Sequence, residues 1–165
     1  MYYRGPLKYK IYLAGDANNR KIIKKTASGK EVNFSSPETE KGLAKLYVLS
    51  IEKEIVYIGF TSQSITTRLY AGLRSSGENG YHGYKWKHED ELDLSVFVYQ
   101  NLFGDDAELN NEQYKFVEAL EAELVYLVRN KTGNWPRYQN EIHFHSEKTK
   151  TAKIRAEEIY NVLMK

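Results

Sequence analysis

Short β-prone segments recur along the chain, and in residues 8–13 and 92–99 hydrophobic and polar residues alternate with the period of a β-strand. The β-prone segments are residues 8–13, 21–25, 31–34, 45–50, 54–60 and 92–99. Turn-forming residues separate the first three segments, which predicts a small basic meander there. The charged Glu52-Lys53-Glu54 separates the apolar runs at 45–50 and 54–60, so these two runs are predicted to form a β-hairpin.

Apolar residues recur at helical spacing in three other segments. We predict helices from 65 to about 74, from 110 or 111 to about 130, and from about 149 to 164. Thr61-Ser62-Gln63-Ser64 supplies an N-cap for the first helix, and Gly133-Asn134-Trp135-Pro136 stops the second. Strands and helices in this order predict an α+β protein, with helices packed on a mainly antiparallel sheet.

The composition narrows the class of protein. A chain of 165 residues is expected to form one domain, and it contains 14 tyrosines, no cysteine and a net charge of +2. The absence of cysteine excludes disulfides, thiolate metal sites and cysteine nucleophiles. No signal-peptide pattern opens the chain and no apolar run approaches the roughly 20 residues that cross a bilayer. We therefore expect an intracellular, cytoplasmic protein without a membrane partner, while the oligomeric state stays open.

Four side chains are candidates for chemistry. The predicted hairpin presents the phenols of Tyr47 and Tyr57, Arg68 lies on the helix that follows, and Glu121 lies on the long helix. Phenols, a guanidinium and a carboxylate are the groups needed to cut a phosphodiester with a metal ion. Taken singly, the two tyrosines are equally at home as half-buried strand residues.

Glu121 differs from the neighbouring glutamates in its place on the helix. It falls within the apolar stripe, one turn after Val117 and just under one turn before Leu124, while Glu118 and Glu123 fall to either side. A carboxylate on a buried face is costly unless an arginine or a cation pairs it. The alternative is that Glu121 lies at the edge of the stripe and reaches solvent or an ion pair.

With these residues in order, the chain resembles the GIY-YIG nuclease family. Val56-Tyr57-Ile58-Gly59-Phe60-Thr61 matches the second half of the family's motif, while Lys45-Leu46-Tyr47 stands where Gly-Ile-Tyr is usual. Arg68 follows Gly59 at the family's distance. Glu121-Ala122-Glu123-Leu124-Val125 is similar to the segment that carries the family's metal-binding glutamate. Pro136-Arg137-Tyr138-Gln139-Asn140 is similar to its Pro-x-x-Asn ending, with one extra residue.

The resemblance implies a division of the chain into three parts. One position of the family's pattern, Gly72, lacks the usual side chain. Residues 44–141 would form the nuclease core, a small three-stranded, mainly antiparallel sheet flanked by helices. Residues 1–43 would be an N-terminal β-rich extension, and residues 142–165 a C-terminal helical one. Family members often carry His or Tyr four residues after the arginine, where this chain has Gly72; Tyr70, Tyr81 or His82 are the candidates to supply that group.

The resemblance also implies roles for the candidate residues. Glu121 would hold one divalent cation, Mg²⁺ or Mn²⁺, by a hard oxygen ligand. Arg68 would bridge phosphate oxygens with its planar fork, Tyr47 would act as the general base on the attacking water, and Tyr57 would position that water. Gly59 would allow a tight turn of the backbone and clear space for the DNA substrate.

A second group of residues is predicted to contact the substrate. This group is Gly59, Thr61, His82, Tyr84, Lys85, Trp86 and Asn140. The loop from 80 to 87 interleaves aromatic residues with Lys and His, a mixture that can stack on bases and meet phosphates. Trp86 and Tyr84 could equally fill the edge of the core. His143 and His145 lack a third ligand in the sequence, which favours a surface role over a metal site.

The sequence thus predicts a metal-dependent endonuclease that hydrolyses DNA phosphodiester bonds. One alternative is a nucleic-acid-binding protein that keeps the fold and has lost turnover; the altered first motif and Gly72 favour it. A second alternative is a purely structural α+β protein whose tyrosines serve packing. The basic meander at 8–34 is a candidate for recognition of the target, which the sequence does not identify.

Overall fold

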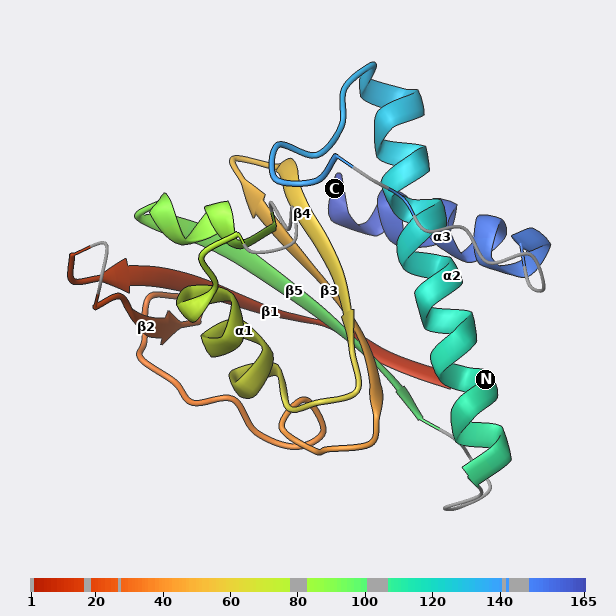
Figure 1. Ribbon diagram of the computed structural model, residues 1–165, viewed down its shortest axis with the longest axis horizontal. Coiled ribbons are helices and arrows are strands. Elements are labelled where there is room, and N and C mark those ends of the chain that lie inside the picture. Colours follow the sequence, from red (N-terminus) through yellow and green to blue (C-terminus); the bar gives the residue numbers. More distant parts are fainter. Residues whose placement is uncertain are drawn as a thin grey trace.

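In the computed structural model, residues 2–16, 19–26, 28–77, 83–100, 107–140, 142 and 149–165 are described. One β-sheet separates two layers of helix (Figure 1). Helix α1 (Ile65–Arg74) and the short 3₁₀ helix η2 (Gly83–His88) lie on one face of the sheet, and helices α2 (Ala107–Thr132) and α3 (Thr149–Leu163) lie on the other. The α+β class predicted from the sequence is confirmed. No helix among the described residues is sufficiently long and apolar to span a membrane.

The sheet contains five antiparallel strands in the described part of the chain. They are β1 (Tyr2–Ala14), β2 (Lys21–Lys25), β3 (Ala44–Ile51), β4 (Glu54–Thr61) and β5 (Glu91–Gln100), and their order across the sheet is β2-β1-β5-β3-β4. The expected three-stranded sheet is therefore too small, because β1 pairs with β5 from Tyr2 to Tyr12 and brings β2 with it. The expected strand at 31–34 is reduced to a single bridge between Lys25 and Glu31.

Local signals explain where the helices begin and end. The Ser64 side chain accepts a hydrogen bond from the backbone N–H of Thr67 and so caps α1. Helix α2 ends one residue before Gly133, whose φ of 78° is a conformation that glycine adopts without strain. The three helices predicted from apolar spacing are present, with ends close to those expected.

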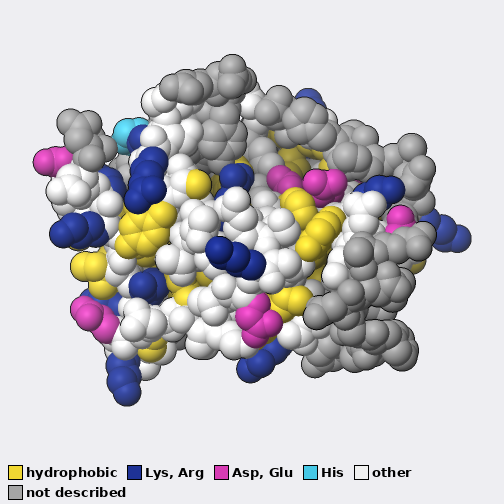
Figure 2. Space-filling view, turned by 60° about the horizontal axis from the view of Figure 1, so that its bottom comes forward, with side chains coloured by type: hydrophobic (Ala, Val, Ile, Leu, Met, Phe, Trp, Pro, Cys, Tyr) yellow, Lys and Arg dark blue, Asp and Glu magenta, His cyan; other side chains and the backbone are white. Residues whose placement is uncertain are grey.

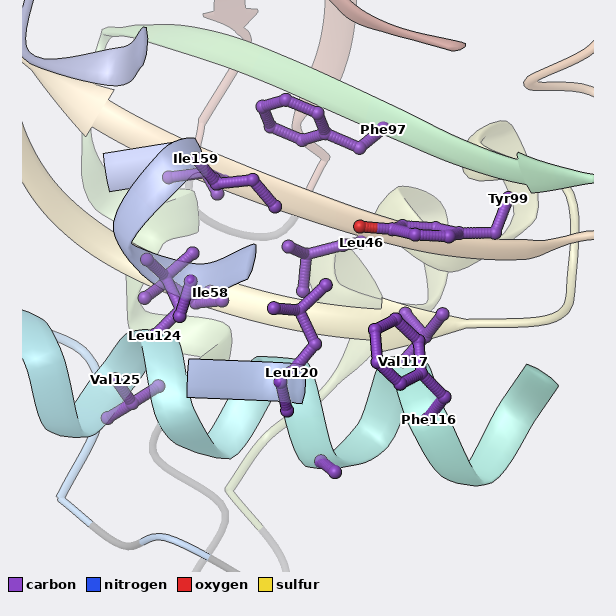
Figure 3. Packing of buried hydrophobic residues seen from close by; sticks show 14 of the residues in the cluster. Leu46, Ile58, Phe97, Tyr99, Phe116, Val117, Leu120, Leu124, Val125 and Ile159 are labelled. Atoms are coloured by element: carbon purple, nitrogen blue, oxygen red, sulfur yellow. The ribbon is translucent and has the colours of Figure 1, made fainter. Parts of the chain in front are cut away.

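Each face of the sheet has its own hydrophobic core, because side chains of successive strand residues point to opposite faces. Leu46 and Ile58 point to the α2 face, where they meet Leu120 and Leu124 (Figure 3). Tyr47 belongs to the other core with Leu69 of α1 and Trp86 of η2, together with other apolar residues of β1 and β5. The candidate phenols therefore belong to the α1 face.

Candidate active site

A β-bulge in β4 brings the two tyrosines to the same face. Ser50 pairs with Ile55, but Leu49 pairs with Tyr57, so one extra residue, Val56, is inserted in β4. In a regular hairpin Tyr57 would lie opposite Val48 and would point to the α2 core. With the bulge, Tyr57 shares the α1 face with Tyr47, and the two ring centres are 5.9 Å apart.

The bulge also places Gly59 opposite Tyr47 in the neighbouring strand. The Tyr47 ring lies directly over this glycine: a Cβ atom added to Gly59 would be 2.5 Å from the hydroxyl oxygen and from Cζ of the ring. No real Cβ contact is that short, so a glycine is required wherever the ring keeps this position. Gly59 is therefore needed because its missing side chain leaves room for the phenol ring. Its backbone conformation does not require glycine, since its φ is not in the left-handed region.

Arg68 connects the two phenols to α1. It lies on the first turn of the helix, where its backbone N–H donates to the carbonyl of the cap residue Ser64. Its Nε donates to the Tyr47 hydroxyl at 2.9 Å, and its Nη2 donates to the Tyr57 hydroxyl at 3.5 Å. The second bond is at the long limit for a hydrogen bond and is weak. The guanidinium is partly exposed while Tyr47 and Tyr57 are 2 % and 4 % exposed, so Arg68 forms the solvent side of the cluster.

Glu121 reaches this cluster around the edge of the sheet. It comes from α2 on the opposite face, but β4 is an edge strand, so the outer N–H groups of β4 are free to bond to other elements. The Glu121 carboxylate accepts a hydrogen bond from the backbone of Phe60, next to Gly59, and interacts electrostatically with Arg68. Glu121 is partly exposed. The structure thus brings together all four residues for which a catalytic role is predicted.

Burial raises the pKa of Glu121 to about 7 from an ordinary value of 4.5. The positive charge of Arg68 and the Phe60 hydrogen bond oppose this shift, and the charge of Glu118 adds to it. Burial disfavours an ionised carboxylate, so the increase means that these two interactions only partly offset the loss of water. The carboxylate therefore exchanges a proton in the neutral pH range.

Glu123 is more deeply buried than its place beside the apolar stripe predicts. It is 4 % exposed, because α3 packs on α2 along a second face that the stripe alone does not show. Burial raises the pKa of Glu123, and the charge of Lys153 of α3 opposes the shift. Glu123 thus belongs to the contact between α2 and α3, away from the tyrosine cluster.

The segment from 136 to 140 closes the outer edge of β4, and its key residue is Gln139. The Gln139 side-chain amide donates to the Ile58 carbonyl and accepts from the Ile58 N–H, both at 3.1 Å. The Tyr138 N–H donates to the Val56 carbonyl at 2.9 Å. Sequence reasoning singled out Asn140, which is exposed, and missed Gln139. The available signal was spacing, because Gln139 occupies the fourth position of Pro-x-x-Asn when counted from Pro136.

Lys45 is a second residue that sequence reasoning missed. It precedes Tyr47 by two residues, so the two side chains start on the same face of β3. The residue is completely buried, and its Nζ donates to the carbonyls of Glu40 and Leu43 at 2.7 Å each. Burial lowers the pKa of Lys45 to about 8, against the charges of Glu40 and Glu38. Lys45 therefore fixes the segment before β3.

Two predicted substrate contacts, Trp86 and Thr61, are buried and make contacts within the protein. Trp86 is 2 % exposed and packs on α1, where a Cβ atom added to Gly72 would be 2.7 Å from its ring. It cannot stack on a base in this position, so the alternative of a core tryptophan is correct. Thr61 is buried, and its hydroxyl accepts from the Gln63 N–H at 3.0 Å, which stabilises the turn into α1. The small Gly72 makes room for the Trp86 ring.

The remaining predicted contacts divide into described and undescribed residues. Lys85 is exposed on η2. His82, Tyr81, His143, His145 and the side chain of Tyr84 lie outside the described residues. The predictions for these five therefore stay predictions.

Helices α1 and η2 carry a surplus of positive charge. Helices α1 and η2 together contain Arg68, Arg74, Lys85 and Lys87 and no acidic residue. Lys87 donates to the carbonyls of Leu73 and Ser75 and so ties η2 to the end of α1. Figure 2 shows Lys and Arg side chains gathered toward its left end, where Figure 1 places η2 and β2. This surface is suited to a phosphate backbone.

The oxygen ligand that Glu121 offers fits a hard divalent cation that takes few of its ligands from the protein. Within the described ranges, no three His, Cys, Asp or Glu side chains gather so as to hold a metal ion. A single carboxylate suits Mg²⁺, which keeps several waters and accepts phosphate oxygens. The neighbouring Glu118 adds negative charge. Glu121 is the residue that would hold the cation.

Comparisons of the chain with models of protein families, with curated proteins and with solved structures found no match.

Proposed function

We propose that this protein is a metal-dependent endonuclease that hydrolyses phosphodiester bonds of DNA. The observation that carries the proposal is the hydrogen bond from Arg68 to the Tyr47 hydroxyl beside Gly59, one residue from the backbone group that holds Glu121. A base, a cation for the phosphate and a metal ligand thus meet at one edge of the sheet. The motifs that resemble the GIY-YIG family contain the same residues in the same order.

Tyr47 is the proposed general base. Its oxygen already accepts a hydrogen bond from Arg68 Nε, and this positive charge stabilises the negative charge on the phenol oxygen when a proton leaves. The oxygen then takes a proton from the attacking water. Gly59 leaves the space that the Tyr47 ring needs. Tyr57, whose ring centre is 5.9 Å from that of Tyr47, would position the water from the other side.

Arg68 is proposed to bind the scissile phosphate as well as the phenol. Its Nε is directed to Tyr47, while Nη2 makes only a 3.5 Å contact with Tyr57. A guanidinium has five N–H donors in a planar fork, and this fork matches the charge that develops on phosphate oxygens in the transition state. A cation bound at Glu121 would supply Lewis-acid stabilisation of the phosphate and of the leaving 3′ oxygen.

DNA is the proposed substrate because of the charge around the site. The phosphate backbone supplies most of the non-specific affinity for proteins, through Lys and Arg contacts. Helices α1 and η2 provide Arg74, Lys85 and Lys87 in addition to Arg68, and neither helix contains a carboxylate.

The alternative is a DNA-binding protein without turnover. The observation that favours it is the burial of the proposed base, since the Tyr47 residue is only 2 % exposed. The altered first motif at Lys45 and the glycine at 72 point the same way. Such a protein would keep the basic surface of α1 and η2 and would bind DNA in a salt-dependent manner.

An assay on supercoiled plasmid separates the two candidates. The wild-type protein is incubated with the plasmid in Mg²⁺, in Mn²⁺ and in EDTA, and a mobility-shift experiment on the same samples measures binding. The endonuclease should convert supercoiled plasmid to nicked or linear forms with either cation and not with EDTA. A mobility shift without conversion in any cation would instead support the non-catalytic protein.

A further inference from the structure

A polar hollow lies on the face of the sheet opposite Tyr47. The registers place Lys8 beside Ser95 and Lys10 beside Asp93, and Ser50 of β3 pairs with Asp93. Ser95 also pairs with Val48, which belongs to the core beneath α2 and α3, so this row points to the helix-covered face. The hollow has a volume of about 280 Å³.

The wall of the hollow comes from three other parts of the chain. Lys53 belongs to the turn between β3 and β4, and Leu163 and Lys165 lie at and just after the end of α3. The Lys53 ammonium donates to the backbone carbonyl of Lys165 at 3.3 Å. The sheet face changes from apolar to polar at this place because α3 ends here and no longer covers it.

Positive charge exceeds negative charge in the lining. The charged side chains that line the hollow are Lys8, Lys10, Lys53, Lys165 and Asp93. Lys10 is 3.4 Å from Asp93 and also bonds to Glu91, just outside the hollow, so the two carboxylates share that one lysine. Four lysines against these two carboxylates leave a net charge of +2, which favours an anionic ligand.

Ser95 adds a hydrogen-bond donor that packing does not explain. It is 8 % exposed and lines the hollow, and among the described residues no side chain or backbone group bonds to its hydroxyl. Its oxygen is not among the buried side-chain atoms that lack a partner, so the hydroxyl is open to the hollow. It is therefore available to a ligand oxygen.

We propose that this hollow binds a phosphate monoester, carried by a nucleotide-sized molecule or by the phosphorylated end of a nucleic-acid strand. A monoester carries close to two negative charges at neutral pH, while a backbone diester carries one, and the surplus of cations favours the former. The volume is near the lower limit for small-molecule sites, about 300 Å³, so it suits a phosphate with a sugar. This proposal is independent of the endonuclease activity, because the hollow and Tyr47 lie on opposite faces of the sheet.

The proposal is tested by NMR titration of the full chain with 2′-deoxyadenosine 5′-monophosphate, with deoxyadenosine as the ligand that lacks the phosphate. The nucleotide should give saturable shifts centred on the Ser50, Asp93 and Ser95 amides, and deoxyadenosine should not. Lys8→Glu should weaken binding about ten-fold or more, because it reverses one charge contact, and Ser95→Ala should weaken it by a smaller factor. Neither side chain forms a hydrogen bond or ion pair with another described residue, so these changes should leave the fold intact.

Lys21→Glu is the matched control, since Lys21 is an exposed lysine of β2 outside the hollow. It should leave nucleotide binding unchanged. Equal losses for Lys8→Glu and Lys21→Glu, or the absence of saturable shifts at millimolar nucleotide, would overturn the proposal. Correct folding of each variant is checked in the same spectra.

Two oligonucleotides separate the possible sources of the phosphate. A single strand with a 5′-phosphate that displaces the nucleotide, where the 5′-hydroxyl strand does not, would support the monoester and identify a strand end as a ligand. Displacement by neither strand would support a free nucleotide. Equal binding of both strands without binding of the nucleotide would overturn the proposal, because only diester charge would then be recognised. None of these results depends on whether the plasmid is cut.

Discussion

Nε of Arg68 donates a hydrogen bond of 2.9 Å to the hydroxyl oxygen of Tyr47, and this contact joins helix α1 to strand β3. It orients the phenol and places a positive charge on the oxygen that is proposed to receive the proton of the attacking water. The contact depends on the glycine opposite, because any side chain at 59 would occupy the position of the ring.

Tyr47→Phe tests the proposed base while keeping the ring. The cleavage rate should fall by about 10²-fold or more, which is the usual contribution of a general base. Arg68 would lose its partner, but its partial exposure allows water to replace the phenol, so the melting temperature should change little. Single-turnover cleavage and thermal melting measure the two effects. A variant as fast as the wild type would remove Tyr47 from this role.

Gly59→Ala should act through the same ring. The added methyl would overlap the Tyr47 ring, and overpacking of this kind costs about 1–3 kcal/mol of folding free energy. The ring must also leave Arg68, so cleavage should be lost. Gly72→Ala is the comparison, because its methyl would overlap Trp86 to a similar degree without touching Tyr47. Melting curves should show destabilisation of both variants, and cleavage should fall further for Gly59→Ala; the reverse order of cleavage rates would contradict the assigned role of Gly59.

Glu121 should make stability depend on pH in the absence of metal. Its folded-state pKa of about 7 lies above the ordinary 4.5, so the folded state binds the proton more tightly than the unfolded state does. The stabilisation that this proton provides is complete below pH 4.5 and is lost as the pH rises through 7. Glu121→Gln should remove this part of the pH dependence and should be more stable than the wild type at alkaline pH. Urea unfolding across this range measures it.

The affinity for the metal ion should also depend on the titration of Glu121, and it should rise as the pH rises. A cation binds the ionised carboxylate, so the apparent affinity for Mn²⁺ should rise about ten-fold per pH unit below the pKa and level off above it. Isothermal calorimetry at several pH values gives the profile. An affinity that is constant through the neutral range would show that another group holds the cation.

Gln139→Leu tests the residue that closes the edge of β4. The change leaves the Ile58 N–H and carbonyl without their partner, which costs about 1–3 kcal/mol for each buried group that water does not reach. Asn140→Ala is the matched control at an exposed position. Chemical denaturation should show a clear loss for the first variant and almost none for the second. Similar losses for both would mean that the segment, rather than the Gln139 amide, holds the strand.

Local patterns predicted the elements well because they depend on neighbouring residues. The spacing of Ile65, Leu69 and Leu73 and the cap at Ser64 were sufficient for α1. The hairpin followed from its two apolar runs, although its turn residues Glu52 and Lys53 both have positive φ, which normally calls for Asn or Gly.

Features that depend on distant contacts could not be predicted in this way. The pairing of β1 with β5 joins segments about 80 to 100 residues apart, so the sheet was expected to have three strands. The inserted residue at Val56 leaves no signal in the apolar pattern, although it decides the face on which Tyr57 lies. Glu121 was singled out correctly as unusual. That its side chain reaches the tyrosine face past the edge of the sheet could not be predicted, because this depends on β4 being the edge strand. The burial of Glu123 depends on α3, which is remote in sequence.

The cleavage rate of Glu121→Gln on plasmid DNA at saturating Mg²⁺ tests the central claim most directly, because this change removes the metal ligand and keeps the size of the side chain. The account predicts a loss of about 10³-fold or more relative to the wild type, with DNA binding in the mobility-shift assay retained. Cleavage by Glu121→Gln at a rate close to that of the wild type would contradict it.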